Sequence, residues 1–256
     1  MQLLAERKPP DALIDQATTE ICKLAKAKNV RLLFDAEQDA VQQGIYAWTL
    51  RYQKKFNGGG SDKAIVYGTY QAYLRSTPAT LAEHLHIAQR EGFRLGVKLV
   101  RGAYMASDPR HLFWDRKKET DRVYDGILEV LITRTYNDVL RPHGESTREV
   151  PEVNMVLATH NHASVKKAMI LREQQTDRGE RKIDMVYAQL MGMADEVSCE
   201  LVMAGKRSIA LDGKDQSAIR GTKVFKYLVW GSVGECTKYL LRRAEENRDA
   251  VLRAKS

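Results

Sequence analysis

Long hydrophobic runs are missing from this chain of 256 residues. A membrane-spanning helix needs about 18 or more consecutive apolar residues, and no stretch of the sequence approaches that length. The opening residues, MQLLAERKPPDALIDQ, have no long apolar core and contain several acids, so we expect neither a secretory signal nor a transit peptide here. With 43% hydrophobic and 29% charged residues, the chain has an ordinary globular composition and is long enough for one large α/β domain.

Cysteine is also scarce. The three cysteines, Cys22, Cys199 and Cys236, are odd in number, and no two of them have the spacing of metal ligands. We interpret them as free thiols in a reducing compartment. Because no pair of histidines forms an HExxH zinc motif either, we expect no metal site.

Several catalytic and binding signatures are absent. The sequence contains no GxGxxG, GxxxxGK[ST] or GxSxG motif, no convincing Cys/His dyad and no carboxylate pair that can be assigned to glycoside hydrolysis. Since no strong nucleophile is evident, chemistry in which a cofactor supplies the reactivity is favoured. The net charge is +8, but the basic residues are interleaved with acids and form no run with aromatic residues, which argues against a nucleic-acid partner.

Short apolar runs alternate with longer amphipathic stretches throughout the chain. The short runs predict strands at Arg31–Ala36, Ala64–Tyr70, Leu95–Arg101, Val153–His160, Met185–Met191 and Val224–Trp230. The longer stretches predict helices at Glu37–Phe56, Pro78–Glu91, Leu112–Leu140, Ala163–Gln174, Glu196–Met203 and Gly234–Leu252. Repeated strand–helix units indicate a parallel sheet, either an open doubly wound sheet or a (β/α)8 barrel.

Polar residues end nearly every predicted strand, which favours the barrel, because barrel sites lie at the carboxyl ends of the strands. We find no linker or internal repeat and expect a single domain over residues 1–256. Only six strands can be counted, however, whereas a closed barrel of this type has eight.

Four of these strand ends carry candidate ligand-binding groups. Asp35 faces the barrel mouth or caps the next helix. In Lys98-Leu-Val-Arg101-Gly102, a Lys98 side chain that points into the barrel needs an anion or an electron-rich ligand. Gly102 leaves space for a ligand to approach the backbone closely. The alternative is an edge strand whose charged side chains face solvent. Gln71 either binds a ring with mixed donor and acceptor edges or lies in an exposed turn. Thr159-His160-Asn161 places three hydrogen-bonding side chains in a row.

The predicted last helix carries Tyr239-Leu-Leu-Arg242-Arg243-Ala-Glu-Glu246-Asn247. Tyr239 and Arg242, and likewise Arg243 and Glu246, are three residues apart and are neighbours on a helix. Two guanidinium groups offer planar sets of donors that can bind a small carboxylate. The alternative is a solvated helix face with weak ion pairs.

The strings KLVRGAY, ATHN, AQLMGMAD and YLLRRAEEN, in this order, resemble the proline dehydrogenase family, particularly its eukaryotic mitochondrial members. The similarity extends from about Arg31 to Asn247. It implies a (β/α)8 TIM-type barrel that holds FAD and oxidises L-proline to Δ1-pyrroline-5-carboxylate. It further implies that electrons pass to quinone, at the matrix side of the mitochondrial inner membrane.

The resemblance also implies roles for particular residues. Arg242 and Arg243 would pair with the proline carboxylate, and Tyr239, Tyr227 and Leu190 would wall the substrate pocket. Asp35 would lie at the substrate end of the flavin, Lys98 near its reactive nitrogen, and Glu246 would complete the polar network of the last helix. The residues expected to hold or line the FAD are Ala36, Gln71, Lys98, Val100, Arg101, Gly102, Thr159, His160, Asn161, Gln189 and Glu246.

The chain departs from the family pattern at its amino-terminal end. It begins with a helix-like segment and then reaches what would be the third barrel strand, with no counterpart for the first two. We therefore expect a barrel that lacks its first two strands, about the C-terminal two thirds of the catalytic domain. The alternative to an active oxidase is a catalytically incomplete fragment or paralogue with an interaction role.

Overall fold

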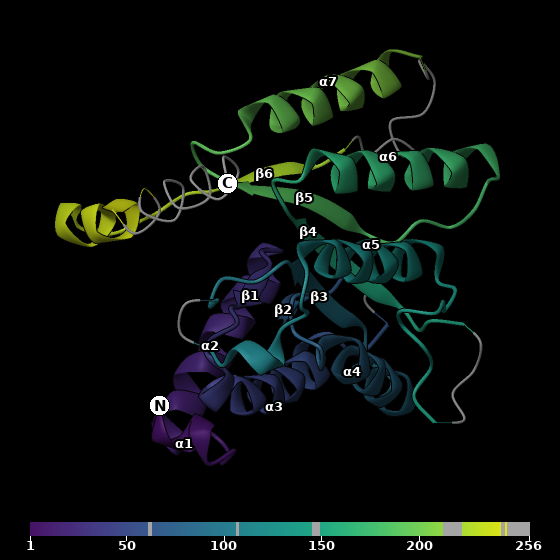
Figure 1. Ribbon diagram of the computed structural model, residues 1–256. Helices are drawn as coiled ribbons and strands as arrows, with labels where there is room; N and C mark the ends of the chain where they lie inside the picture. The colour runs from purple at the N-terminus through teal and green to yellow at the C-terminus, as the bar shows by residue number, and fades with distance from the viewer. Residues whose placement is uncertain (61–62, 106–107, 145–148, 212–221, 242–243, 245–256) are drawn as a thin grey trace.

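Six parallel strands form one curled sheet, and the helices that connect them lie around its outside (Figure 1). This computed structural model describes residues 1–60, 63–105, 108–144, 149–211, 222–241 and 244. The strands are β1 (Leu32–Phe34), β2 (Val66–Gln71), β3 (Leu95–Val100), β4 (Val153–Ala158), β5 (Met185–Leu190) and β6 (Val224–Tyr227). Each strand pairs in parallel with the next one along the chain, in the order β1-β2-β3-β4-β5-β6.

The helices alternate with these strands. They are α1 (Gln2–Ala5), α2 (Ala12–Lys28), α3 (Asp39–Phe56), α4 (Thr77–Glu91), α5 (Lys117–Thr133), α6 (His162–Asp177) and α7 (Asp195–Leu211), with a short 3-10 turn at Arg110–Leu112. Residues 233–241 are also helical. None of the helices within the described ranges combines the length and the hydropathy needed to cross a bilayer.

Local signals explain where several helices begin and end. The Asp11 side chain accepts a hydrogen bond from the backbone N–H of Ile14 and caps α2, which stops at Asn29 in the left-handed conformation. A proline in the first turn of α4 supplies the backbone angle that a helix needs, and Gly92 ends that helix with φ +70°. The Asn161 side chain caps α6 in the same way as Asp11 caps α2.

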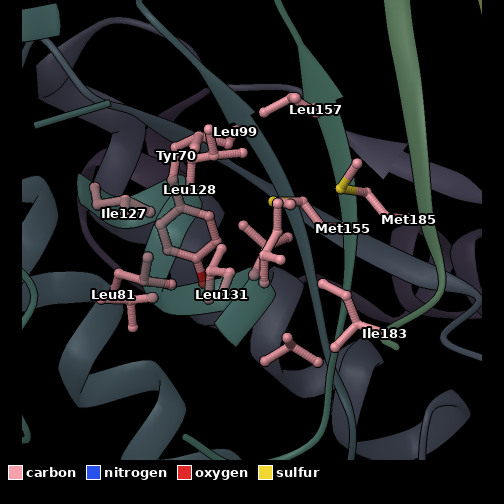
Figure 2. Close-up of a cluster of buried hydrophobic side chains, with 14 of the residues drawn as sticks. Tyr70, Leu81, Leu99, Ile127, Leu128, Leu131, Met155, Leu157, Ile183 and Met185 are labelled. Carbon is pink, nitrogen blue, oxygen red and sulfur yellow. The ribbon is translucent and has the colours of Figure 1, made fainter. Parts of the chain in front are cut away.

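The main hydrophobic core lies between the sheet and its helices. Alternate strand residues, among them Leu99, Leu157 and Met185, point outward and pack against Ile127 and Leu131 of α5 and their neighbours (Figure 2). These side chains are almost wholly buried, so this layer supplies most of the hydrophobic stabilisation.

The intervening strand residues point to the inside of the curl. The register aligns Thr69 with Lys98, Lys98 with Val156, and Val156 with Val186 on this inner face. A smaller buried cluster of Ala64, Tyr67, Val156 and Val186, with Ala158 and Ala188 against it, fills the middle of the lumen. The inner face is therefore apolar in its middle and carries a charge at Lys98.

An ion-pair bridge crosses the lumen at the amino ends of the strands. The Asp184 carboxylate, just before β5, accepts from Arg31 Nη2 at 2.5 Å and from Lys223 Nζ at 2.9 Å. Arg31 precedes β1 and also donates to the hydroxyl of Tyr67 at 3.2 Å. Burial opposes ionisation, but hydrogen bonds from Lys223 and Arg31 outweigh it and lower the pKa of Asp184.

Comparison with the predictions favours the barrel over the doubly wound sheet. All six predicted strands are present, and their sequential order never reverses, as it would at the switch point of a doubly wound sheet. The predicted helix Leu112–Leu140 was wrong at both ends. The observed helix, α5, covers Lys117–Thr133, because Arg134 adopts the left-handed conformation and stops it before Leu140. The predicted last helix, Gly234–Leu252, begins one residue earlier, and most of it after residue 241 lies outside the described residues.

Candidate functional site

Lys98 and Asp35 meet on the inner face of the sheet. Lys98 lies in the central strand β3, and its ammonium forms an ion pair with the Asp35 carboxylate, which directly follows β1. The Lys98 side chain is only 17% exposed, whereas that of Asp35 is 58% exposed. A largely buried ammonium thus has a partner that is itself open to the mouth of the lumen. The edge-strand alternative for Lys98 was wrong, and so was the helix-cap alternative for Asp35, because Gln38 occupies the cap position of α3.

Gln71 supplies an unused hydrogen-bond donor beside this pair. It ends β2, is 1% exposed and aligns with Val100 of β3. Its Oε1 accepts from the backbone N–H of Ala103 at 3.3 Å, but its buried Nε2 has no hydrogen-bond partner among the described residues. A buried amide N–H without a partner costs free energy, so it fits a ligand that offers an acceptor. The exposed-turn alternative for Gln71 was wrong.

Small apolar residues continue the inner face at the level of Gln71. Val100 of β3 neighbours Gln71 in register, and Ala158 of β4 aligns with Ala188 of β5. Because the two alanines project little from the sheet, this level offers space for a flat apolar group. Ala36, on the other side of Asp35, is buried, and its carbonyl accepts from the Tyr104 hydroxyl at 3.1 Å.

Gly102 follows β3 with φ +143°, a conformation that favours glycine. A Cβ at this position would lie 2.2 Å from the ring of Tyr73, which stacks on Phe113. The close approach that requires glycine here is thus made by a protein side chain. The Tyr73 hydroxyl also accepts from the backbone N–H of Tyr104 at 3.2 Å, so this ring fixes the turn after β3.

Arg101 faces the helices rather than the lumen. Its Nε donates to Asp121 at 3.0 Å, its Nη1 to Thr159 Oγ1 at 2.7 Å and its Nη2 to Ser164 Oγ at 2.9 Å. The guanidinium carbon lies 4.3 Å from the centre of the Tyr124 ring, in a cation–π contact. In this arrangement the side chain joins the end of β3 to α5, to the end of β4 and to α6.

The Thr159-His160-Asn161 segment after β4 is held by protein contacts on three sides. Thr159 Oγ1 accepts from the backbone N–H of Asn161 at 3.1 Å, in addition to Arg101. Asn161 caps α6, and His160 Nε2 accepts from the backbone N–H of Leu190 at 3.0 Å. Burial and the nearby Lys226 ammonium lower the pKa of His160, which keeps its ring neutral near pH 7.

The end of β5 carries Gln189 and Leu190, whose side chains alternate between the two faces of the sheet. Gln189 is buried; its Oε1 accepts from Ser198 of α7 at 3.0 Å, and its Nε2 donates to the Thr159 carbonyl at 3.4 Å. Leu190 aligns with Tyr227 of β6. Gln189 therefore contacts α7, whereas Leu190 belongs to the same face as Tyr227.

Two of the predicted substrate-pocket residues lie together. The rings of Tyr227 and Tyr239 have centroids 5.9 Å apart and are tilted by 36°. Tyr227 is 47% exposed, so its ring is open to a ligand. Residues 233–241 begin with a capping box in which Ser232 and Glu235 exchange hydrogen bonds, and this places Tyr239 opposite β6. Arg242, Arg243 and Glu246 lie outside the described residues.

The sequence interpretation overlooked several residues that build this site. Tyr73 and Tyr104 fix the turn after β3, while Asp121 and Ser164 bind Arg101. For Arg101 a signal was available: residues 98 and 101 are three apart, so their side chains lie on opposite faces of a strand. The partners on α5 and α6 carry no such signal, because only the folded structure brings them to the strand end.

The arrangement can bind and polarise a flat ligand. A cation at Lys98, an unpartnered amide donor at Gln71 and a floor of small residues converge at the carboxyl ends of β2 to β5. A cavity of about 190 Å³ lined by Arg31, Lys63, Lys223 and their neighbours lies instead at the amino ends of the strands. Among the described residues, no group of His, Cys, Asp and Glu is arranged to hold a metal ion.

Comparison with known proteins connects this geometry to one family. Residues 3–255 match the family described as "Proline dehydrogenase". The chain is 32% identical over 247 residues to "Probable proline dehydrogenase, mitochondrial" of Schizosaccharomyces pombe. The aligned region covers 92% of this chain and 46% of that protein. It is 31% identical over 232 residues to "Proline dehydrogenase 1, mitochondrial" of Homo sapiens, covering 89% of this chain and 34% of that protein. The chain thus spans less than half the length of these curated relatives.

A solved structure has the same fold. Proline utilization A (PutA) from Bdellovibrio bacteriovorus, inactivated by N-propargylglycine, superposes with a TM-score of 0.61 at 21% sequence identity. The superposition covers 88% of this chain and 20% of that much longer one. At this level of identity the likeness supports the fold.

Proposed function

The chain belongs to the proline dehydrogenase family, and on that basis we propose that it forms the FAD- and proline-binding part of an enzyme that oxidises L-proline to Δ1-pyrroline-5-carboxylate. The observation that carries this proposal is the convergence, at one end of the family fold, of the Lys98–Asp35 pair and the unpartnered Gln71 amide. Electrons would pass to quinone. Because relatives are named mitochondrial, we place the reaction in mitochondria. The family resemblance further leads us to propose the matrix side of the inner membrane.

The residues at the strand ends fit an isoalloxazine ring. Gln71 Nε2 is a buried hydrogen-bond donor without an acceptor among the described residues. The edge of a flavin ring carries carbonyl oxygens and ring nitrogens that could accept this hydrogen bond. Ala158, Ala188 and Val100 leave room for a flat ring on the inner face. Bound FAD would accept a hydride, which is the reactivity that no side chain of this sequence supplies.

The chain's own charged residues would prepare that transfer. The Lys98 ammonium lies on the lumen side of β3 and would stabilise negative charge that develops on an adjacent ring. Asp35 holds this ammonium in place and is open to the mouth of the lumen. Tyr227 and Tyr239 would wall the substrate ring, with Leu190 beside them.

The carboxylate of proline requires a positive partner. Arg242 and Arg243 follow Tyr239 by three and four residues in the sequence, and a guanidinium binds a carboxylate through two parallel hydrogen bonds. Fixing the carboxylate orients the ring before reaction and removes rotational freedom that would otherwise slow it. We assign substrate binding to these two arginines.

One observation favours a second candidate function, that of an incomplete barrel with an interaction role. Among the described strands, β1 and β6 are each paired on one side only. Phe225, Leu228 and Trp230, on and after β6, are exposed apolar side chains. Such an edge can accept a further strand from another polypeptide segment.

The visible absorption spectrum of the purified chain tests these two candidates. We expect a flavin band that bleaches when L-proline is added without oxygen, and a Lys98→Met variant that binds flavin but bleaches more slowly. Lys167→Met, at a helix position on the outside of the sheet, is the control and is expected to behave like the wild type. A band that does not bleach would support the incomplete barrel, and the absence of any flavin after incubation with FAD would refute the proposed activity for this chain.

A further inference from the structure

The cavity at the amino ends of the strands has a wall that is partly cationic and partly apolar. Its volume is about 190 Å³, several times what a single water molecule needs, so it has room for a small organic molecule. The cationic side chains in its wall are those of Arg31, Lys63 and Lys223, and the apolar ones are those of Ala64, Ile65 and Phe225. These residues lie at or before the starts of β1, β2 and β6, whereas Gln71 and Lys98 of the candidate site lie toward the other ends of their strands.

Two of the cations share a single carboxylate. Arg31 Nη2 and Lys223 Nζ both donate to Asp184, so these three side chains together carry one positive charge in excess. Arg31 Nε donates to the Tyr67 hydroxyl, but none of the described residues accepts from Arg31 Nη1 or from the other two N–H groups of Lys223. The Arg31 and Lys223 side chains are only 23% and 29% exposed, so water hydrates this excess charge incompletely.

Such a wall favours an anion that also carries a hydrocarbon part. A partly buried charge is stabilised by an opposite charge, and a hollow with an excess of one sign concentrates ions of the other sign. The guanidinium of Arg31 can bind a carboxylate or a phosphate through parallel hydrogen bonds. Ala64, Ile65 and Phe225 have no polar side-chain atoms, and Phe225 is 50% exposed, so these side chains can cover a short apolar chain.

We propose that this cavity binds a small organic oxyanion, a carboxylate or a phosphate monoester with a short apolar chain, through the side chains of Arg31 and Lys223. The oxyanion neutralises the charge that Asp184 leaves uncompensated, and the apolar chain lies against Ile65 and Phe225. The site is separate from the one assigned to FAD and proline, so the inference does not depend on the proposed oxidase activity.

NMR titrations of the full, 15N-labelled chain with small probes test the proposal without FAD or turnover. We expect n-butyrate and n-propyl phosphate to shift the backbone amide signals of Ala64, Ile65 and Phe225, and the tighter of the two identifies carboxylate or phosphate as the preferred group. Neutral butyramide is expected to bind at least about tenfold more weakly than butyrate, because it lacks the charge-assisted contacts. Acetate, which is two methylene groups shorter, is expected to bind about fivefold more weakly.

Three results of these titrations would overturn the proposal. Equal affinities for butyrate and butyramide would exclude recognition of the charge, and equal affinities for butyrate and acetate would exclude the apolar contact. Shifts of the Gln71 and Lys98 signals without shifts of the Ala64 and Phe225 signals would place the anion at the other end of the strands.

Two variants alter the charge of the cavity in opposite directions. Lys223→Met leaves Arg31 and Asp184 as a balanced pair, and we expect the Kd for butyrate to rise about tenfold. Asp184→Asn leaves two cations without their carboxylate, and we expect the Kd to fall about fivefold. A purely structural bridge would instead give the same direction of change, or no change, in both variants.

Lys54→Met is the matched control, because Lys54 and Arg90 also share one carboxylate, that of Glu91, but on α3 and α4, outside the cavity wall. Its Kd for butyrate is expected to stay within about twofold of the wild-type value. The proposal is overturned if Lys223→Met binds butyrate as tightly as Lys54→Met does. If Asp184→Asn does not give the dispersed spectrum of a folded chain, Lys223→Met and the comparison of butyrate with butyramide decide the question.

Discussion

The Arg101 network permits a quantitative prediction, in which Arg101→Met removes the guanidinium but keeps a side chain of similar length. Three hydrogen bonds and the stacking on Tyr124 are lost. Hydrogen bonds that involve a charged group contribute about 1.5–3 kcal/mol each, so their simple sum would be large. However, the former partners of Arg101 keep other contacts, which reduces the loss in the free energy of unfolding.

The remaining contacts decide the magnitude. Lys117 still binds Asp121 at 2.6 Å, Asn161 still donates to Thr159, and Ser164 still donates to Asp125 at 2.5 Å. Because each partner keeps one contact, and because the guanidinium is partly exposed, we expect a loss of about 2–4 kcal/mol in the free energy of unfolding. Arg101→Lys keeps the charge but not the planar set of donors, and we expect about half of that loss.

Urea denaturation followed by circular dichroism measures the free energy of unfolding of both variants. Arg122→Met is the control, since Arg122 makes an exposed ion pair with Asp138 and its loss is expected to cost less than about 1 kcal/mol. The reasoning is refuted if Arg101→Met unfolds with the same free energy as Arg122→Met. In that case, a selective loss of FAD affinity in Arg101→Met would assign the side chain to the cofactor instead.

Two further predictions concern Gly102 and His84. Gly102→Ala is expected to lower the free energy of unfolding by roughly 2–3 kcal/mol, because the new methyl group meets Tyr73. Gly192 also has a positive φ but lies in open space, so Gly192→Ala is expected to lower it by about 1 kcal/mol in the same urea assay. Equal losses in the two variants would exclude the Tyr73 contact as the cause. Burial lowers the pKa of His84 to about 4, below its ordinary value, so the stability that its neutral form contributes is full above pH 6.5 and is lost as the pH falls toward 4. Urea midpoints across this range are expected to fall less steeply in His84→Asn than in the wild type or in the exposed His111→Asn control, and parallel slopes would contradict the prediction.

Much of the fold could be predicted because each strand is a short apolar run between turn-forming residues. The runs around Leu99, Leu157 and Met185 proved to be strands whose outward side chains form the main core. The end of α5 was harder to predict, because Arg134 is an ordinary residue for a helix and its left-handed conformation depends on the loop that follows. Hydrophobic periodicity identifies an element more reliably than it identifies its last turn.

The candidate site was less accessible to prediction, because it depends on pairing between distant strands. Lys98 was singled out as a charge inside a core strand, but its pairing with Asp35 follows only from the register of β1, β2 and β3. Gln71 was chosen for its chemistry, and the structure adds that its Nε2 is buried without a partner. The opposite orientations of Lys98 and Arg101 are a matter of strand alternation and could have been deduced from their spacing.

The ion-pair bridge at Asp184 has a mechanical consequence for the sheet. It fixes the distance between the start of β1 and the starts of β5 and β6, at the end of the lumen opposite Lys98 and Gln71. Spreading β1 and β6 apart at this end would therefore break a contact of the Asp184 carboxylate with Arg31 or with Lys223.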